Sequence, residues 1–170
     1  MKIVLSLVFS LFLALAAFGQ QSAGTPAQQF NAYTLDGNPV SLNAMRGKVV
    51  VMMFWSTKCA ICHAEIPKLN KIAAKYAGQN VEFLGLTMNN EALVNDYLKK
   101  RPFNFTIIPN GLGVLMQYSD KDSAGRLNMG FPSYFIVDQS GQVTQKSNGW
   151  DKTGKIDAEI SRLLASRSAE

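Results

Sequence analysis

An unbroken apolar run, Val49–Trp55, leads directly into a segment with helical spacing, and this feature most constrains how the chain can fold. The run is short, begins with β-branched residues and shows no alternation, which is typical of a strand buried on both faces of a sheet. From Ala60 to Tyr76 the apolar residues fall near one face of a helix. The sequence therefore predicts a buried strand followed by a helix, with Ser56–Cys59 at their junction.

The rest of the chain predicts an α/β domain with one core. A second strand and a second helix repeat the order strand then helix, which implies a right-handed parallel crossover. Pro67 lies inside the first helix, where it removes a hydrogen bond and should kink the helix. The second strand and the second helix are expected over 81–86 and 91–100. After them we expect a strand over 105–108, a helix over 113–118 and a loop over Ser119–Asn128. The last elements that we expect are a hairpin of strands 133–137 and 142–146 and a closing helix over 153–166.

Three features organise the chain before the buried strand. Lys2, the apolar run Ile3–Phe18 and a small-residue exit predict a signal peptide over residues 1–19. The run is shorter than the roughly 20 residues of a membrane span, so cleavage is favoured over a permanent anchor. A short connector over 20–26 then precedes the domain, 27–170, which opens with a hairpin turning at Asp36-Gly37. We expect an extracytoplasmic protein, periplasmic or secreted, with a membrane anchor only if the leader stays uncleaved.

The composition narrows the class of partner. The chain is 47% hydrophobic and 17% charged, which supports a packed interior. Its formal charge is +5, but the cations are scattered, without the block or the interleaved aromatic residues that nucleic-acid binding favours. We therefore expect no nucleic-acid partner, and we expect the protein to be a monomer.

Both cysteines lie in one tetrapeptide, Cys59-Ala60-Ile61-Cys62. A bond across so small a loop stabilises a fold by less than the roughly 3 kcal/mol of a 15-residue loop, so the pair is better placed for reactivity than for stapling. Cys59 lies at the predicted helix N-terminus, where unpaired N–H groups favour a thiolate. Lys58 either adds positive charge there or points to solvent. Cys62, one turn further on, should be more buried, so we interpret Cys59 as the nucleophile and Cys62 as the resolving thiol.

These motifs together resemble the thioredoxin-like thiol-disulfide oxidoreductases of the TlpA/ResA type, which act outside the bacterial cytoplasm. The resemblance covers Phe30 to about Leu164 and implies a thioredoxin-like fold, with a central mixed β-sheet flanked by helices and an added N-terminal hairpin. The pieces that carry it are Leu35-Asp36-Gly37 to Leu42, Gly47-Lys48, Phe54-Trp55, Cys59-Ala60-Ile61-Cys62, Glu65, Pro67, Phe131-Pro132 and Phe135-Ile136-Val137-Asp138.

The resemblance implies a role for several side chains around the dithiol. Pro132 is similar to the cis-proline that faces the active-site disulfide, where the backbone of neighbours such as Phe131 meets an incoming peptide. Glu65 resembles the acid that manages a proton during exchange in ResA-type members, or is an exposed helix residue. Trp55 resembles the aromatic residue under the active-site loop and is a candidate substrate contact, or is simply a core residue ending a strand. Lys58 would influence which partners dock.

Three departures from the family pattern leave the substrate open. Lys58 stands where the family usually has Trp, Met53 stands where thioredoxins bury an Asp, and the segment Ser119–Asn128 is longer than usual. Without that buried Asp, either Glu65 gains importance or the proton goes to solvent. The implied function is reduction of disulfides in partner proteins, with a membrane electron donor, no cofactor beyond the Cys59–Cys62 disulfide, and cytochrome c maturation as one candidate process. The direction of electron flow stays open.

The same residues permit other interpretations. Cys59-Ala60-Ile61-Cys62-His63 matches C-x-x-C-H, the attachment pattern of c-type haem, in which His63 and one of Met88, Met116 or Met129 would ligate iron. Two thiols and the single imidazole could also contribute to a zinc or copper site, although we expect no metal. A third alternative is a binding module that retains an inactive dithiol.

Overall fold

A five-stranded mixed sheet forms the centre of the computed structural model, which describes residues 22–167. The strand order is β5-β4-β3-β8-β9; β3, β4 and β5 are parallel, whereas β8 runs antiparallel to both β3 and β9. This is the mixed sheet that the family resemblance implies, and the strand boundaries lie within two residues of those expected from the sequence. The strands are β3 (Val49–Trp55), β4 (Val81–Thr87), β5 (Thr106–Ile108), β8 (Ser133–Val137) and β9 (Val143–Asn148).

The central strand β3 is buried on both faces, as its unbroken apolar sequence predicts. Its side chains alternate between two cores, because successive residues of a strand point to opposite faces. Val51, Met53 and Trp55 pack into the core on one face, while Met52 and Phe54 pack into the core on the other. The strand therefore holds its C-terminal end, where the dithiol segment begins, in a rigid position.

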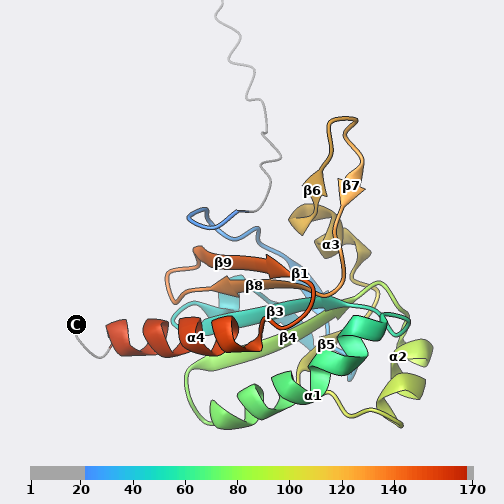
Figure 1. The fold of residues 1–170 in the computed structure, drawn as a ribbon, viewed down its shortest axis with the longest axis horizontal. Coiled ribbons are helices and arrows are strands. Elements are labelled where there is room, and N and C mark those ends of the chain that lie inside the picture. The colour runs from blue at the N-terminus through green and yellow to red at the C-terminus, as the bar shows by residue number, and fades with distance from the viewer. Residues whose placement is uncertain (1–21, 168–170) are drawn as a thin grey trace, which may run out of the picture.

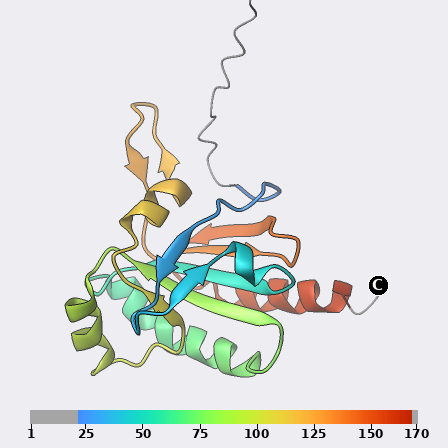
Figure 2. The ribbon, with the colours of Figure 1, turned by 180° about the vertical axis from the view of Figure 1, so that it is seen from behind.

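Helices and the leading hairpin cover the two faces of the sheet (Figures 1 and 2). The helices α1, α2 and α4 supply apolar side chains to the core that contains Trp55. The helix α3, the short 3-10 helix η1 and the segment around the hairpin β1-β2 cover the opposite face. The elements are β1 (Asn31–Tyr33), β2 (Pro39–Ser41), η1 (Asn43–Met45), α1 (Ala60–Lys75), α2 (Glu91–Leu98), α3 (Leu112–Tyr118) and α4 (Thr153–Arg167).

The predicted N-terminal hairpin is present and is fastened to the sheet. Gly37 adopts φ +77°, a left-handed conformation that favours glycine, and its N–H bonds the Thr34 carbonyl across the turn at 2.9 Å. The Leu35 N–H donates to the carbonyl of Ile107 on the edge strand β5 at 2.8 Å. The hairpin thus covers part of a sheet edge.

Part of the expected connector runs along the other sheet edge. The Gly24 N–H donates to the Val143 carbonyl at 2.7 Å, and Pro26 forms an isolated bridge with Gln142. The expected signal peptide, residues 1–19, lies outside the described residues. Within residues 22–167, none of the helices has the length and apolar character needed to cross a membrane.

The expectation of a loop over residues 119–128 is wrong. The segment forms a small hairpin of β6 (Asp120–Lys121) and β7 (Leu127–Asn128), which projects from the body of the domain (Figure 1). The carboxylate of Asp122 accepts the Ala124 and Arg126 N–H groups, both at 2.9 Å, and this closes the turn. The paired residues are polar or exposed, so no apolar alternation marks them in the sequence.

Candidate active site

The two cysteines form a disulfide at the junction of β3 and α1, where the sequence places them. Cys59 is the N-cap of α1, and its sulfur accepts the Cys62 N–H at 3.1 Å. Cys62 is fully buried, whereas Cys59 is partly exposed. An attacking thiol needs access to its partner, and a helix N-terminus favours its thiolate. The difference in exposure therefore supports Cys59 as the nucleophile and Cys62 as the resolving thiol.

A clamp on Thr57 holds the segment that leads to Cys59. The Thr57 N–H donates to Asn89 Oδ1, and the Thr57 carbonyl bonds His63 Nε2, both at 2.9 Å. Asn89 lies two residues beyond the end of β4, and its own carbonyl accepts the Asn110 N–H at 3.0 Å. The residue two places before the reactive thiol is thus fixed from both sides. Sequence reasoning missed Asn89, whose only signal was its place at the carboxyl end of a parallel strand next to β3.

Trp55 forms the floor beneath this segment. Its side chain is fully buried. The distance between ring centroids is 5.0 Å from Trp55 to Tyr97 and 5.4 Å from Trp55 to Phe103. The imidazole of His63 also packs on Tyr97, with 5.1 Å between the ring centroids. The expectation that Trp55 contacts a partner protein is not met in this conformation, because the indole has no exposed surface. Its alternative interpretation, a core residue that ends a strand, describes it.

The Phe131-Pro132 peptide bond is cis, as the resemblance implies. Ser133 pairs with Phe54, so Pro132 lies next to the end of β3 from which the chain proceeds to Cys59. Phe131 is half-buried and contacts both cores. The cis-proline segment and the dithiol segment are therefore neighbours where the C-terminal end of β3 meets the N-terminal end of β8.

Glu65 is fully buried, so the interpretation as an exposed helix residue is wrong. Lys68 Nζ bonds its Oε1 at 2.9 Å, and the Asp151 N–H donates to its Oε2 at 3.1 Å. The hydrogen bond to Glu65 is the main cause that raises the pKa of Lys68. Glu65 follows Cys62 by three residues on α1, and such neighbours have Cβ atoms about 5–6 Å apart. A carboxylate with two donors therefore lies within one turn of the resolving thiol.

Lys58 and Met53, two positions where the sequence departs from the family pattern, lie in different environments. Lys58 is exposed, and its N–H donates to the Ser56 hydroxyl at 3.3 Å. Met53 is fully buried opposite Tyr134 on β8. The core beneath the dithiol thus has a thioether at the position where thioredoxins bury a carboxylate.

The geometry counts against the haem hypothesis. Both sulfurs are engaged in one disulfide, and His63 Nε2 is bonded to the Thr57 carbonyl. Haem attachment needs both thiols as thioethers and a free imidazole nitrogen for iron. For the alternative of a zinc or copper site, residues 22–167 contain no group of three or more His, Cys, Asp and Glu side chains that could hold a metal ion.

Comparison with known families agrees with this site. A family model described as Redoxin matches residues 22–164. The chain belongs to the Redoxin family. It is 28% identical over 142 residues to the thiol-disulfide oxidoreductase ResA of a Bacillus cereus strain, a match that covers 82% of this chain and 78% of ResA.

This Redoxin-family chain is also similar to two further proteins. The soluble secreted antigen MPT53 of Mycobacterium bovis is 31% identical over 114 residues, covering 66% of this chain and 65% of the antigen. The crystal structure of a thioredoxin-family thiol:disulfide interchange protein from Chlorobium tepidum TLS superposes with a TM-score of 0.71 at 24% identity, covering 84% and 98% of the two chains. The second match confirms the predicted thioredoxin-like fold.

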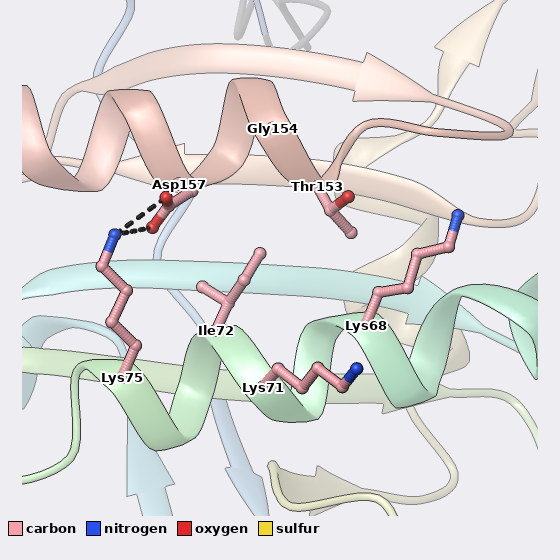
Figure 3. A pocket seen from close by; sticks show the side chains of 7 residues that line it. All are labelled: Lys68, Lys71, Ile72, Lys75, Thr153, Gly154 and Asp157. Atoms are coloured by element: carbon pink, nitrogen blue, oxygen red, sulfur yellow. Dashed lines mark hydrogen bonds and ion pairs between the residues drawn. The ribbon is translucent and has the colours of Figure 1, made fainter.

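A groove of about 340 Å³ lies between α1 and α4 of the Redoxin-family domain (Figure 3). Lys68, Lys71 and Lys75 line its α1 side, and Asp157 bonds Lys75 across it at 2.7 Å. The hydroxyl of Tyr76 also donates to Asp157, at 2.8 Å. The groove contains neither cysteine, and its ion pair ties the two helices together.

Asp157→Asn should lower the free energy of unfolding at neutral pH by about 0.5–1 kcal/mol, a small value because solvent screens this partly exposed pair. The Lys75 and Tyr76 hydrogen bonds lower the pKa of Asp157 below its value in the unfolded chain. A lowered carboxyl pKa stabilises the fold above the unfolded pKa of about 4. The difference between the two proteins should therefore disappear as the pH falls through the folded pKa. Urea unfolding across this range measures it.

The matched control is Asp96→Asn, which removes an exposed ion pair with Lys99 at the end of α2. That ion pair does not connect two separate elements. We expect no measurable change for the control. A loss in Asp157→Asn that persists unchanged in acid would contradict the electrostatic explanation.

Proposed function

We propose that this protein is an extracytoplasmic thiol-disulfide oxidoreductase that reduces disulfides in partner proteins. The observation that carries the proposal is the difference in solvent exposure between the two cysteines at the start of α1, beside a cis-proline. Cys59 is partly exposed, whereas Cys62 is buried. The similarity to ResA supports the reaction class. The similarity to a secreted antigen supports the location outside the cytoplasm, together with the apolar leader of the sequence.

The proposed reaction is a pair of thiol-disulfide exchanges. The Cys59 thiolate attacks one sulfur of the partner disulfide, forms a mixed disulfide and releases the other partner sulfur as a thiolate. The Cys62 thiolate then attacks Cys59, which releases the second partner thiolate and forms the Cys59–Cys62 disulfide. Two electrons pass to the partner, and the two protons of the original thiols go to the partner thiolates or solvent. A membrane donor of thiol electrons would restore the dithiol, and apocytochrome c is one candidate substrate.

The clamp on Thr57 and the helix N-terminus supply what the first step needs. The clamp fixes the backbone just before Lys58 and Cys59, and the N–H groups of the first turn, among them the Cys62 N–H that the Cys59 sulfur accepts, favour a negative sulfur. Positioning of this kind lowers the entropy that must be lost when the two sulfurs meet. Phe131 and Lys58 lie where a partner chain would approach, and we assign them to substrate contact.

The test of this function is reduction of insulin with dithiothreitol as the electron source. The protein should accelerate precipitation of the insulin B chain well above the rate with dithiothreitol alone. No acceleration would overturn the proposal in favour of a binding module. A Soret band in the purified, full-length protein would instead establish the haem hypothesis.

The direction of electron flow has its own measurement, which is the reduction potential in a glutathione or dithiothreitol buffer series. A reductant should titrate near about −270 mV or below, the range of thioredoxin. A value well above about −180 mV would identify an oxidant or isomerase.

We further propose that Glu65 manages the proton of the resolving thiol, because its buried carboxylate lies one turn from Cys62. Removing this negative charge should favour thiolates in the reduced protein. Glu65→Gln is therefore expected to make iodoacetamide alkylation of Cys59 severalfold faster at mildly acidic pH, shifting its pH profile to lower pH. Alkylation quenched at timed intervals and followed by mass spectrometry gives the profile.

Glu91→Gln is a control that removes an exposed acidic side chain at the start of α2. Its profile should match that of the unmodified protein. If the profile of Glu65→Gln also stays unaltered, Glu65 has no part in the proton transfer.

A further inference from the structure

A short loop between β9 and α4 is bonded to both halves of the candidate site. The Gly149 N–H donates to the carbonyl of the cis-proline, Pro132, at 2.8 Å. Two residues later the Asp151 N–H donates to Oε2 of the buried Glu65 on α1 at 3.1 Å. The loop therefore connects the cis-proline segment to the helix that carries Cys62, and Trp150 lies between the two residues that make these bonds.

Trp150 is held in place although its side chain is 54% exposed. Lys68 Nζ lies 4.6 Å from the centre of its ring, in cation–π contact. The same ammonium group bonds Glu65 at 2.9 Å and lies 3.7 Å from the Asp151 carboxylate. The cation under the indole is thus fixed by two carboxylates, and the loop backbone is fixed at both ends. A large apolar surface is presented to solvent in a defined position.

Such a surface is well suited to a partner protein. Tryptophan is enriched among the residues that dominate binding energy at interfaces, and a side chain that is already ordered loses little entropy when a partner packs on it. Two other apolar residues belong to the same site: Ile61, 40% exposed on the first turn of α1, and the half-buried Phe131. The dithiol segment, the cis-proline segment and the loop therefore each offer apolar surface.

We propose that Trp150 is a specificity-determining residue whose indole packs on an apolar side chain close to the reacting cysteine of an extended partner segment. The proposal rests on the proposed disulfide exchange, because the partner reaches Trp150 while its sulfur meets Cys59. The bond from Gly149 to Pro132 sets the loop against the segment where such a chain would lie. We assign Trp150 no part in the exchange at the sulfurs, so it selects the substrate and leaves the chemistry unchanged.

The experiment measures mixed-disulfide equilibria in a Cys62→Ser background, where exchange stops at Cys59. Short peptides carry one cysteine as its glutathione disulfide, with leucine placed in turn at each of the two positions before and after it, and with serine at the same positions as reference. At one or more positions leucine should raise the equilibrium constant about fivefold over serine, as partial burial of one such side chain would give. Mass spectrometry of the Cys59-peptide adduct measures the ratio.

The added substitution Trp150→Ala should reduce the leucine preference to about unity, whereas Trp150→Phe should keep most of it. Tyr33→Ala, which removes an exposed aromatic residue from the hairpin on the opposite face of the sheet, should leave it unchanged. The tryptophan fluorescence emission should also shift to shorter wavelength when the leucine peptide is bound, because the peptide covers the exposed Trp150. Trp55 should not contribute to this shift, since it is already buried.

An equal leucine preference with and without Trp150, or no preference at any position, would overturn this inference while leaving the exchange reaction intact. Failure of Cys59 to form an adduct with any peptide, in protein whose Cys59 still reacts with iodoacetamide, would overturn both the proposed function and this inference.

Discussion

Cys59→Ser is expected to reduce the rate of insulin reduction by at least about a thousandfold, because the hydroxyl that replaces the nucleophilic sulfur is essentially never ionised at neutral pH. Cys62→Ser should also lose turnover, but for a different reason. Its first step remains, and the protein then accumulates as a mixed disulfide that only an external thiol resolves. Rates with and without excess dithiothreitol, together with the mass of the protein after mixing, distinguish the two variants.

Ser56→Ala serves as the matched control, since it alters a side chain of the same junction without touching a thiol. Its hydroxyl accepts the Lys58 N–H through a long bond of 3.3 Å, so its turnover should fall by no more than severalfold. If Cys59→Ser retains substantial activity while Cys62→Ser loses it, the assignment of nucleophile and resolving thiol is reversed.

Trp55→Ala is expected to lower the free energy of unfolding by about 3–5 kcal/mol, the range for deleting a large aromatic side chain from a core. The indole is fully buried and packs on Tyr97 and Phe103 beneath the dithiol segment. Its Nε1 has no hydrogen-bond partner among residues 22–167. Trp55→Phe breaks no such bond and removes fewer buried atoms, so it should lower the free energy of unfolding by less than Trp55→Ala does. Urea unfolding followed by circular dichroism measures both.

The second tryptophan of the chain supplies the comparison. Trp150→Ala removes the same side chain from an exposed position and should lower the free energy of unfolding by no more than about 1 kcal/mol, the value of an exposed cation–π contact such as the one with Lys68. Equal losses for Trp55→Ala and Trp150→Ala would contradict the description of one as the floor of the site and the other as a surface for a partner.

The parts of the fold that depend on local apolar pattern could be predicted from the sequence. The run Val49–Trp55 is buried along its whole length, and the spacing from Ala60 onward forms the helix α1. The hairpin β6-β7 could not be predicted in this way, because its strands are very short and its turn is held by the side chain of Asp122. A polar segment closed by one carboxylate has no periodicity to detect.

Contacts between distant residues define the parts of the site that sequence reasoning missed. Asn89 reaches Thr57 only because β3 and β4 are adjacent and parallel. The buried carboxylate of Glu65 is bonded by Asp151, which lies beyond β9 in the chain. Neither contact follows from the residues near it in sequence, whereas the dithiol and the proline were recognisable from their local motifs.

The central claim, that Cys59 is the sulfur that attacks a partner disulfide, is tested most directly by mapping the mixed disulfide formed with insulin. Reduced Cys62→Ser is mixed with insulin, quenched with acid, digested without reduction and sequenced by mass spectrometry. We expect one linkage, from Cys59 to an insulin cysteine, and no adduct in Cys59→Ser under the same conditions. A stable adduct on Cys62 of Cys59→Ser, with none on Cys59 of the reciprocal variant, would contradict the account.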